Sequence, residues 1–412
     1  MLRAPLAPAL SPEGRGSREA DGLAPSPLKG TRKGLGGRLG RGVARSFLVL
    51  GVLVLAACAA PQVEEKPSAV VYYPAPPDTP RLQHLITINS EDDLGEKKSA
   101  LRKFVMGETE EEKSEFIRPW DVAHEKGKLY VLDRELKEVL IIDLATGKFG
   151  RMGASVRQVI QDPFSIFIAE NGYKYIADKG RGQVIVADAR NEFFRAYGSS
   201  KQFDPVDVVV RGDRIYVADL KDHEVEILDR VSGDVVGRIG GLGKEEGSLY
   251  WPTHLALAPN GDLYVTDFLN FRIQRFDKDG EFVGKFGYNG DTPGATPRPK
   301  GVAVDREGRL YVVDNAFELV QIFDVETARL LLAFGKFETG PGSSWLPAGI
   351  NIDYDNLQYF SRFVDKNIRP KYLVYVANQA GPQKLNVYAF GEWIGPDPKT
   401  MEPPAKAKPA SE

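Results

Sequence analysis

The sequence predicts an all-β protein, a six-bladed β-propeller whose blades are four-stranded antiparallel sheets. The stretch Tyr250–Gly287 holds four short apolar-rich runs, and its turns contain the dipeptides Asn260-Gly261 and Asp279-Gly280. Asn-Gly and Asp-Gly supply the positive φ that tight hairpin turns require, so this stretch is typical of a four-stranded meander.

The same pattern recurs along the chain. A proline opens each unit, at intervals of 42 to 48 residues: Pro119, Pro163, Pro205, Pro252, Pro299 and Pro347. Each tyrosine-rich second strand ends in Asp or Asn: Asp133, Asp178, Asp219, Asp267, Asp314 and Asn378. This period is typical of propeller blades, which we expect at about 116–157, 158–199, 200–247, 248–294, 295–342 and 343–391. The recurring Asp most simply accepts backbone hydrogen bonds in the following turn, and a ligand role is the alternative.

The fourth unit resembles a repeat of the NHL family, named for Asn-His-Leu. Asn270, Arg272, Gln274 and Asp277 follow the Asn-x-Arg-x-Gln-x-x-Asp pattern of that family, whereas the other units lack the Asn-x-Arg. The resemblance covers about 81–391 and implies a six-bladed NHL propeller. It says little about function, because one fold carries many unrelated sites.

Residues 1–57 are interpreted as a signal peptide with a long basic leading region. Ser46–Ala57 is an apolar run of about a dozen residues, which is short for a membrane span and suits a signal peptide. It ends in Leu55-Ala56-Ala57-Cys58, which resembles the lipobox of bacterial lipoproteins. The resemblance implies cleavage before Cys58 and lipid on its sulfur. An uncleaved anchor or a chance apolar run is the alternative.

The processed chain would be acidic and bound to a membrane. Cleavage removes nine basic and three acidic residues, which leaves a net charge of −9 and argues against a nucleic-acid partner. Cys58 is the only cysteine, so no structural disulfide is expected. Residues 58–80 are proline-rich and predict an extended tether. We expect an extracytoplasmic location, on the outer membrane if the cell has two membranes, because Ala59 rather than Asp follows Cys58.

Closure of the ring requires a strand from elsewhere in the chain. The sixth unit ends after its third strand, Lys384–Phe390, and the missing fourth strand should come from the N-terminal side. Leu82–Ile88 and Leu101–Gly107 both have the composition for it. The propeller is thus expected to span 81–391 as a monomer, followed by a disordered tail at 392–412.

An insertion at about 355–370 separates the first two strands of the sixth blade. Its aromatic and arginine side chains are candidates for docking a partner: Tyr359, Phe360, Arg362 and Phe363. The alternative is that the aromatic rings fold back onto the blade.

Residues just after each opening proline should surround one mouth of the central channel. The binding candidates there are Trp120, Asp121, Ser165, Asp207, His254 and Lys300. Asp121 and Asp207 could ligate a hard cation such as Ca²⁺, and some six-bladed relatives are metal-dependent hydrolases or lyases. Of the four histidines only His254 falls on this ring, and His124 and His223 are expected to be ordinary loop or strand-edge residues. The alternatives are a water-filled channel and a small organic ligand.

These observations favour binding over catalysis. No nucleophile elbow, phosphate-binding loop or Cys/His metal spacing is present in the sequence. We therefore expect a membrane-anchored scaffold that binds a protein or peptide and needs no cofactor. A Ca²⁺-dependent hydrolase or lyase is the alternative.

Overall fold

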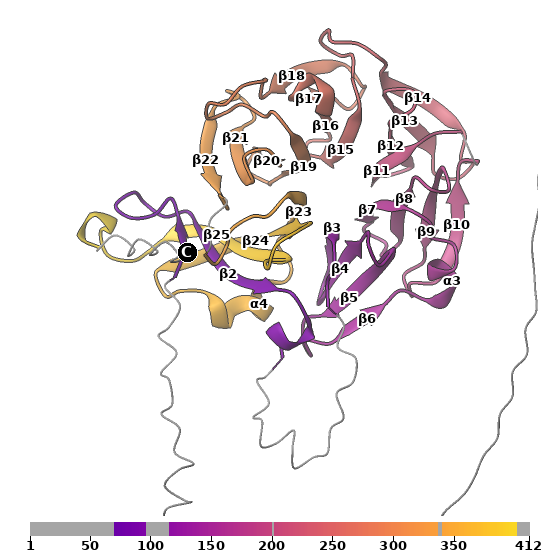
Figure 1. Cartoon of the computed structure of the whole chain (residues 1–412). Helices are drawn as coiled ribbons and strands as arrows, with labels where there is room; N and C mark the ends of the chain where they lie inside the picture. Colours follow the sequence, from indigo (N-terminus) through magenta and orange to yellow (C-terminus); the bar gives the residue numbers. More distant parts are fainter. Residues whose placement is uncertain (1–69, 96–114, 200–201, 337–339, 402–412) are drawn as a thin grey trace, which may run out of the picture. The chain divides into compact units, whose positions relative to one another are not determined.

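The computed structural model describes residues 70–95, 115–199, 202–336 and 340–401. These residues form six antiparallel sheets arranged as the blades of a propeller (Figure 1), which confirms the fold class expected from the repeats. Blade one comprises β3 (Pro119–Glu125), β4 (Lys128–Asp133), β5 (Glu138–Asp143) and β6 (Phe149–Arg151). Blade two comprises β7 (Pro163–Ile168), β8 (Lys174–Asp178), β9 (Gln183–Ala187) and β10 (Phe193–Tyr197).

The next three blades repeat this order. Blade three comprises β11 (Pro205–Arg211), β12 (Arg214–Asp219), β13 (Glu224–Asp229) and β14 (Val235–Gly240). Blade four comprises β15 (Pro252–Leu257), β16 (Leu263–Asp267), β17 (Arg272–Phe276) and β18 (Phe282–Phe286). Blade five comprises β19 (Pro299–Val304), β20 (Arg309–Asp314), β21 (Leu319–Asp324) and β22 (Leu330–Phe334). Five short helices of the described chain lie between strands: η1 (Glu91–Asp93), α3 (Ala154–Arg157), η2 (Phe268–Asn270), α4 (Leu357–Phe360) and η3 (Ser361–Phe363). A sixth, η4 (Pro398–Thr400), follows the last strand.

Blade six joins the two ends of the propeller. Its strands are β23 (Pro347–Asp353), β24 (Ile368–Asn378), β25 (Leu385–Trp393) and, from the N-terminal side, β2 (Leu82–Ile88). β2 pairs antiparallel with β25, from Leu82 opposite Phe390 to Ile88 opposite Leu385. The predicted closure by an N-terminal strand is confirmed, and Leu82–Ile88 provides it. The competing candidate, Leu101–Gly107, lies outside the described residues.

Ordered structure extends beyond the predicted limits of the propeller on both sides. β1 (Tyr72–Tyr73) lies in the predicted tether but pairs with Leu82 and Gln83 of β2. On the other side β25 continues to Trp393, whose ring packs edge-on against Tyr72 at 5.4 Å. The tether and the tail are therefore shorter than predicted, because aromatic residues within each of them extend blade six.

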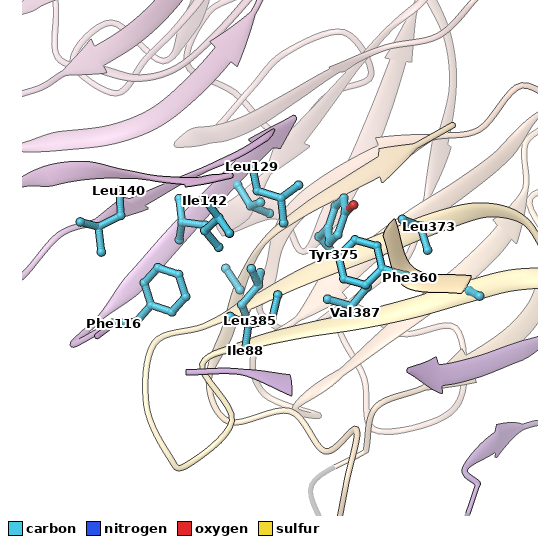
Figure 2. Packing of buried hydrophobic residues seen from close by; sticks show 14 residues of the cluster. Ile88, Phe116, Leu129, Leu140, Ile142, Phe360, Leu373, Tyr375, Leu385 and Val387 are labelled. Atoms are coloured by element: carbon cyan, nitrogen blue, oxygen red, sulfur yellow. The ribbon is translucent and has the colours of Figure 1, made fainter. Parts of the chain in front are cut away.

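Hydrophobic contacts between neighbouring blades stabilise the ring. Each of the six buried clusters combines strands of two adjacent blades, and the cluster between blades one and two also includes Ala348 of blade six. Figure 2 shows the cluster between blades six and one, where Leu129 and Ile142 face Leu373, Tyr375 and Val387. The second strands are buried on both faces, which explains why their sequences are nearly continuous apolar runs rather than alternating ones.

The Asp that ends each second strand fixes the backbone around it. In blade one, Asp133 accepts the N–H groups of Ile117 and Arg118, both at 2.8 Å, and those of Glu135 and Leu136 in the following turn. One carboxylate thus ties the chain entering the blade to the turn after the second strand. The predicted turn role is confirmed for Asp133, and Asp178, Asp219 and Asp314 likewise accept a backbone N–H of the following turn. In blade four, Asp267 accepts the side-chain amide of Asn270 from that turn instead.

Candidate functional site

The innermost strands of the blades surround a central channel. A cavity of about 190 Å³ lies among β3, β7, β11, β15, β19 and β23. Its lining is apolar or glycine except for Asp121, Asp207, His254 and Asn351. The pairing register of these strands shifts just after the opening proline, for example between Pro119 and Asp121, so backbone N–H groups are free to bond elsewhere.

Asp121 and Asp207 use these free N–H groups to join neighbouring blades. Asp121 accepts the N–H of Val122 in its own strand and, with its other oxygen, that of Ile166 in blade two, both at 2.9 Å. Asp207 in blade three likewise accepts the N–H of Val208 and that of Leu255 in blade four, both at 2.7 Å. Each carboxylate is therefore a hydrogen-bonded link between two blades.

The channel shifts the acidity of both carboxyl groups. Burial, and then the nearby Asp207 charge, raises the pKa of Asp121 to about 8. Burial also raises the pKa of Asp207 to about 7, although N–H donors and the Ser165 hydroxyl partly oppose it. Both oxygens of each carboxylate already accept N–H groups, so a cation would have to use their remaining lone pairs. The observed role of Asp121 and Asp207, which the sequence predicts as metal ligands, is thus structural: each carboxylate links two blades.

Lys300, at the start of β19, carries a positive charge at the mouth of the channel. Its ammonium lies 4.9 Å from the centre of the Phe268 ring and 5.5 Å from that of Trp120. Burial, followed by repulsion from Arg298 and Arg134, lowers the pKa of Lys300 to about 8. Within the described part of the chain, no carboxylate forms an ion pair with this ammonium.

Arg134 extends the aromatic and basic surface around Lys300. Its guanidinium lies 3.6 Å from the centre of the Phe164 ring and 4.5 Å from that of Trp120. It also forms an ion pair with Asp162 at 2.7 Å, which holds it in place. The mouth thus combines cations with the faces of three aromatic rings, and we call Trp120, Arg134, Phe164, Phe268 and Lys300 the basic mouth.

The structure places the other predicted mouth residues deeper in the channel. His254 is buried, and burial together with the Lys300 charge lowers its pKa to about 3, so the imidazole is neutral at physiological pH. Ser165 is also buried and lies beside Asp207. Trp120 and Lys300, by contrast, lie beside each other, with the ammonium 5.5 Å from the centre of the indole ring. The sequence did not reveal Arg134 or Phe268, because each follows the second strand of its blade and reaches the mouth from the turn after it.

The insertion of blade six folds back onto the ring. Phe360 is completely buried in the cluster between blades six and one (Figure 2), and Tyr359 and Phe363 pack against the same cluster. The Arg362 guanidinium stacks on Phe363 at 4.7 Å and donates to the Leu94 carbonyl at 2.7 Å. Burial of Phe360 removes it from the predicted docking surface, and the other three side chains are engaged by the blade.

A second polar cluster lies at the opposite mouth of the channel. His124, near the end of β3, faces Asp353 at the end of β23 and Asp355 just beyond it. The sequence pattern predicts only an ordinary loop or strand-edge residue at His124. The signal that could have revealed the cluster is Asn351-x-Asp353-x-Asp355, an alternation that places polar groups on one side of a strand beside blade one.

The lipobox residues Leu55, Ala56, Ala57 and Cys58 lie outside the described residues. Among the helices of the described part, none has the length and apolar character needed to cross a membrane.

Comparison with known proteins supports the fold. Residues 249–276 match the model of the NHL repeat. At the level of sequence, no curated protein matches the chain. A structure of unknown function from Bacteroides thetaiotaomicron is 15% identical, with 75% of each chain covered and a TM-score of 0.52. A gluconolactonase from Xanthomonas campestris is 16% identical over 78% of this chain and 97% of its own, with a TM-score of 0.50.

Virginiamycin B lyase from Staphylococcus aureus is a more distant match, 13% identical over 66% of this chain and 95% of its own, with a TM-score of 0.46. At such identities the likeness concerns the fold alone. The blades, the ring of interfaces and the matched repeat together lead to one conclusion: the chain is a six-bladed β-propeller that carries an NHL repeat at residues 249–276.

Proposed function

We propose that the protein is an extracytoplasmic lipoprotein, anchored through lipid on Cys58, whose propeller binds a protein or peptide at the basic mouth. The observation that carries the binding proposal is the Lys300 ammonium, which lies between two aromatic rings without a carboxylate partner among the described residues. The expected ligand therefore bears a carboxylate, either an acidic side chain or a free C-terminus.

Electrostatics favour an anion at this position. Burial and two neighbouring arginines lower the pKa of Lys300, so the folded protein disfavours the charged ammonium. A carboxylate placed beside the ammonium would offset this effect through a charge-assisted hydrogen bond. The rings of Trp120 and Phe268 would contact the apolar parts of the same ligand, and such aromatic and cationic groups commonly dominate the energy of an interface.

The binding proposal is tested with short acidic peptides, each paired with its C-terminal amide. Lys300→Met keeps the length of the side chain and removes its charge, so affinity for the preferred peptide should fall by about 30-fold or more. Lys278→Met is the matched control, because Lys278 is exposed in the β17–β18 turn at the other face. Equal binding by wild type and Lys300→Met would refute the proposed site.

The anchor is tested separately from the ligand. Growth with a labelled fatty acid should label the wild-type chain, and Cys58→Ser should abolish the label and release the protein from the membrane fraction. A Cys58→Ser protein that remains membrane-bound would refute the lipid anchor and leave the binding proposal untouched.

A metal-dependent hydrolase or lyase is the second candidate. Two carboxyl groups with raised pKa face one channel, and a divalent cation would relieve their repulsion. Asp121 and Asp207 would be the protein ligands, with water or substrate oxygens completing the six to eight that Ca²⁺ takes. Bound there, Ca²⁺ would polarise a substrate carbonyl.

Calcium titration and lactone hydrolysis test this candidate, with lactones chosen because the Xanthomonas neighbour is a gluconolactonase. Asp121→Asn and Asp207→Asn should lose calcium binding and turnover together. Wild-type protein that neither binds calcium nor hydrolyses lactones would contradict it.

A further inference from the structure

We propose that His124, Asp353 and Asp355 form a binding site for a divalent transition-metal ion at the channel mouth opposite the basic mouth. The candidate ligand atoms of the three residues all lie within 4.8 Å of one another. His124 belongs to blade one, whereas both aspartates belong to blade six. A bound ion would therefore bridge the two blades at which the ring closes.

The distances suit a metal ion better than a hydrogen bond. His124 Nε2 lies 3.4 Å from Asp353 Oδ1 and 3.9 Å from Asp355 Oδ2. A charge-assisted N–H···O bond is usually about 2.7–2.9 Å long, so neither separation is that of a hydrogen bond. Zinc bonds of about 2.0–2.2 Å in tetrahedral geometry separate two ligand atoms by about 3.4 Å. The first separation meets this value, and a small rotation of Asp355 would bring the second to it.

The surroundings of His124 fix the tautomer that a metal ion needs. Its Nδ1 lies 2.5 Å from the amide oxygen of Asn351, which can only accept, so the neutral tautomer that suits this contact has its proton on Nδ1. Nε2 is then left with a lone pair directed at the two carboxylates. Metal-bound histidines commonly donate their second N–H to an oxygen in this way.

Asp353 is held equally firmly. Its Oδ1 accepts the backbone N–H groups of Asp355 at 2.7 Å and of Asn356 at 3.2 Å, so a metal ion would use the remaining lone pair of this oxygen. The Asp353 side chain is completely buried, and its Oδ2 accepts hydrogen bonds from the Asn356 amide at 2.7 Å and from the Tyr375 hydroxyl at 2.8 Å. Asn356 in turn bonds to the turn that follows β3, through the Gly127 N–H at 2.7 Å and the Glu125 carbonyl at 3.0 Å. Two of the three ligands are thus preorganised by hydrogen bonds that link blades one and six.

Asp355 is more exposed to solvent than the other two ligands, which leaves one side of the site open. Its side chain is 60% exposed, whereas that of His124 is 20% exposed. Coordination positions on this side would be filled by water or by an external ligand, as in zinc sites with three protein ligands. One imidazole and two carboxylates favour an ion such as Zn²⁺ or Mn²⁺ over an all-oxygen Ca²⁺ site. The site is separate from the basic mouth, so neither proposal depends on the other.

The test uses the full chain, stripped with EDTA and dialysed against limiting Zn²⁺. We expect about one zinc per chain and a rise in Tm of several degrees, because the ion binds the folded state only. Asp355→Asn should lose both effects without unfolding, since the described structure shows no side-chain hydrogen bond from Asp355. His124→Gln should behave in the same way.

Two controls separate this site from other acidic groups. Asp279→Asn removes an exposed carboxylate from the β17–β18 turn, and Asp213→Asn removes one from the β11–β12 turn. Both variants should keep one zinc. Wild-type protein without zinc, or Asp355→Asn protein that retains it, would overturn the proposal.

Discussion

At the scale of single residues, the channel depends on close contacts that only certain side chains allow. Asp121 and Asp207 join blades through backbone N–H groups, and Gly349 leaves room for Asp121. A Cβ on Gly349 would lie 2.6 Å from Asp121 Oδ1 and 2.7 Å from the Trp120 carbonyl oxygen. The sequence showed a polar residue at this position in four blades and a glycine, Gly301 or Gly349, in the other two. It could not show the hydrogen bonds between blades, because these depend on the register shifts of the strands and on how closely neighbouring blades pack.

Gly349→Ala should therefore destabilise the propeller by about 1–3 kcal/mol, because the new methyl group displaces the backbone or the Asp121 carboxylate. Gly284→Ala is the control, since a Cβ there meets no atom within 4 Å. Urea unfolding of both variants measures the difference. Equal free energies of unfolding for the two variants would contradict this expectation and show that the channel accommodates the added methyl group.

The raised pKa values of Asp121 and Asp207 make stability depend on pH. Both lie well above the ordinary value of 3.8, so the folded state holds protons that the unfolded state releases. Their contribution is fully present below about pH 4 and is lost as pH rises through about 7 to 8. We expect the free energy of unfolding to fall between pH 6.5 and 7.5 more steeply in wild type than in Asp207→Asn. Identical slopes in the two proteins would contradict the assigned protonation.

At the scale of elements, the blade strands could be predicted closely, whereas β1 and the insertion of blade six could not. Turn dipeptides and apolar runs located the blade strands, because each hairpin carries its own local signal. β1 escaped prediction, since two tyrosines within a proline-rich stretch form a strand only against β2. The insertion looked like an exposed aromatic surface, and only its packing on blade one shows that Phe360 is core.

β2 should contribute strongly to stability although it is distant in sequence from its partner β25. Ile88 is completely buried between blades six and one, so Ile88→Ala should cost about 2–5 kcal/mol. Leu242→Ala is the control, because Leu242 is 68% exposed. Thermal or urea unfolding compares them. An Ile88→Ala protein as stable as the Leu242→Ala protein would mean that β2 does not close the ring.

At the scale of the whole molecule, the ring presents two chemically different mouths. The basic mouth offers aromatic rings and an ammonium without an anionic partner among the described residues, whereas the opposite mouth offers imidazole and carboxylates. The repeat pattern predicted the ring and the positions at the first mouth. It could not predict either chemistry in full, because each mouth gathers side chains from blades far apart in sequence.

The most direct test of a scaffold that acts through its basic mouth is photo-crosslinking in intact cells. A photoreactive amino acid would replace Trp251, which is 44% exposed and immediately precedes Pro252 on the mouth side, or Lys278 in the β17–β18 turn at the opposite face. The account predicts a discrete crosslinked protein from position 251 and none from position 278, with the crosslink lost when Lys300→Met is added. A crosslink that persists with Lys300→Met, or one formed only from position 278, would contradict it.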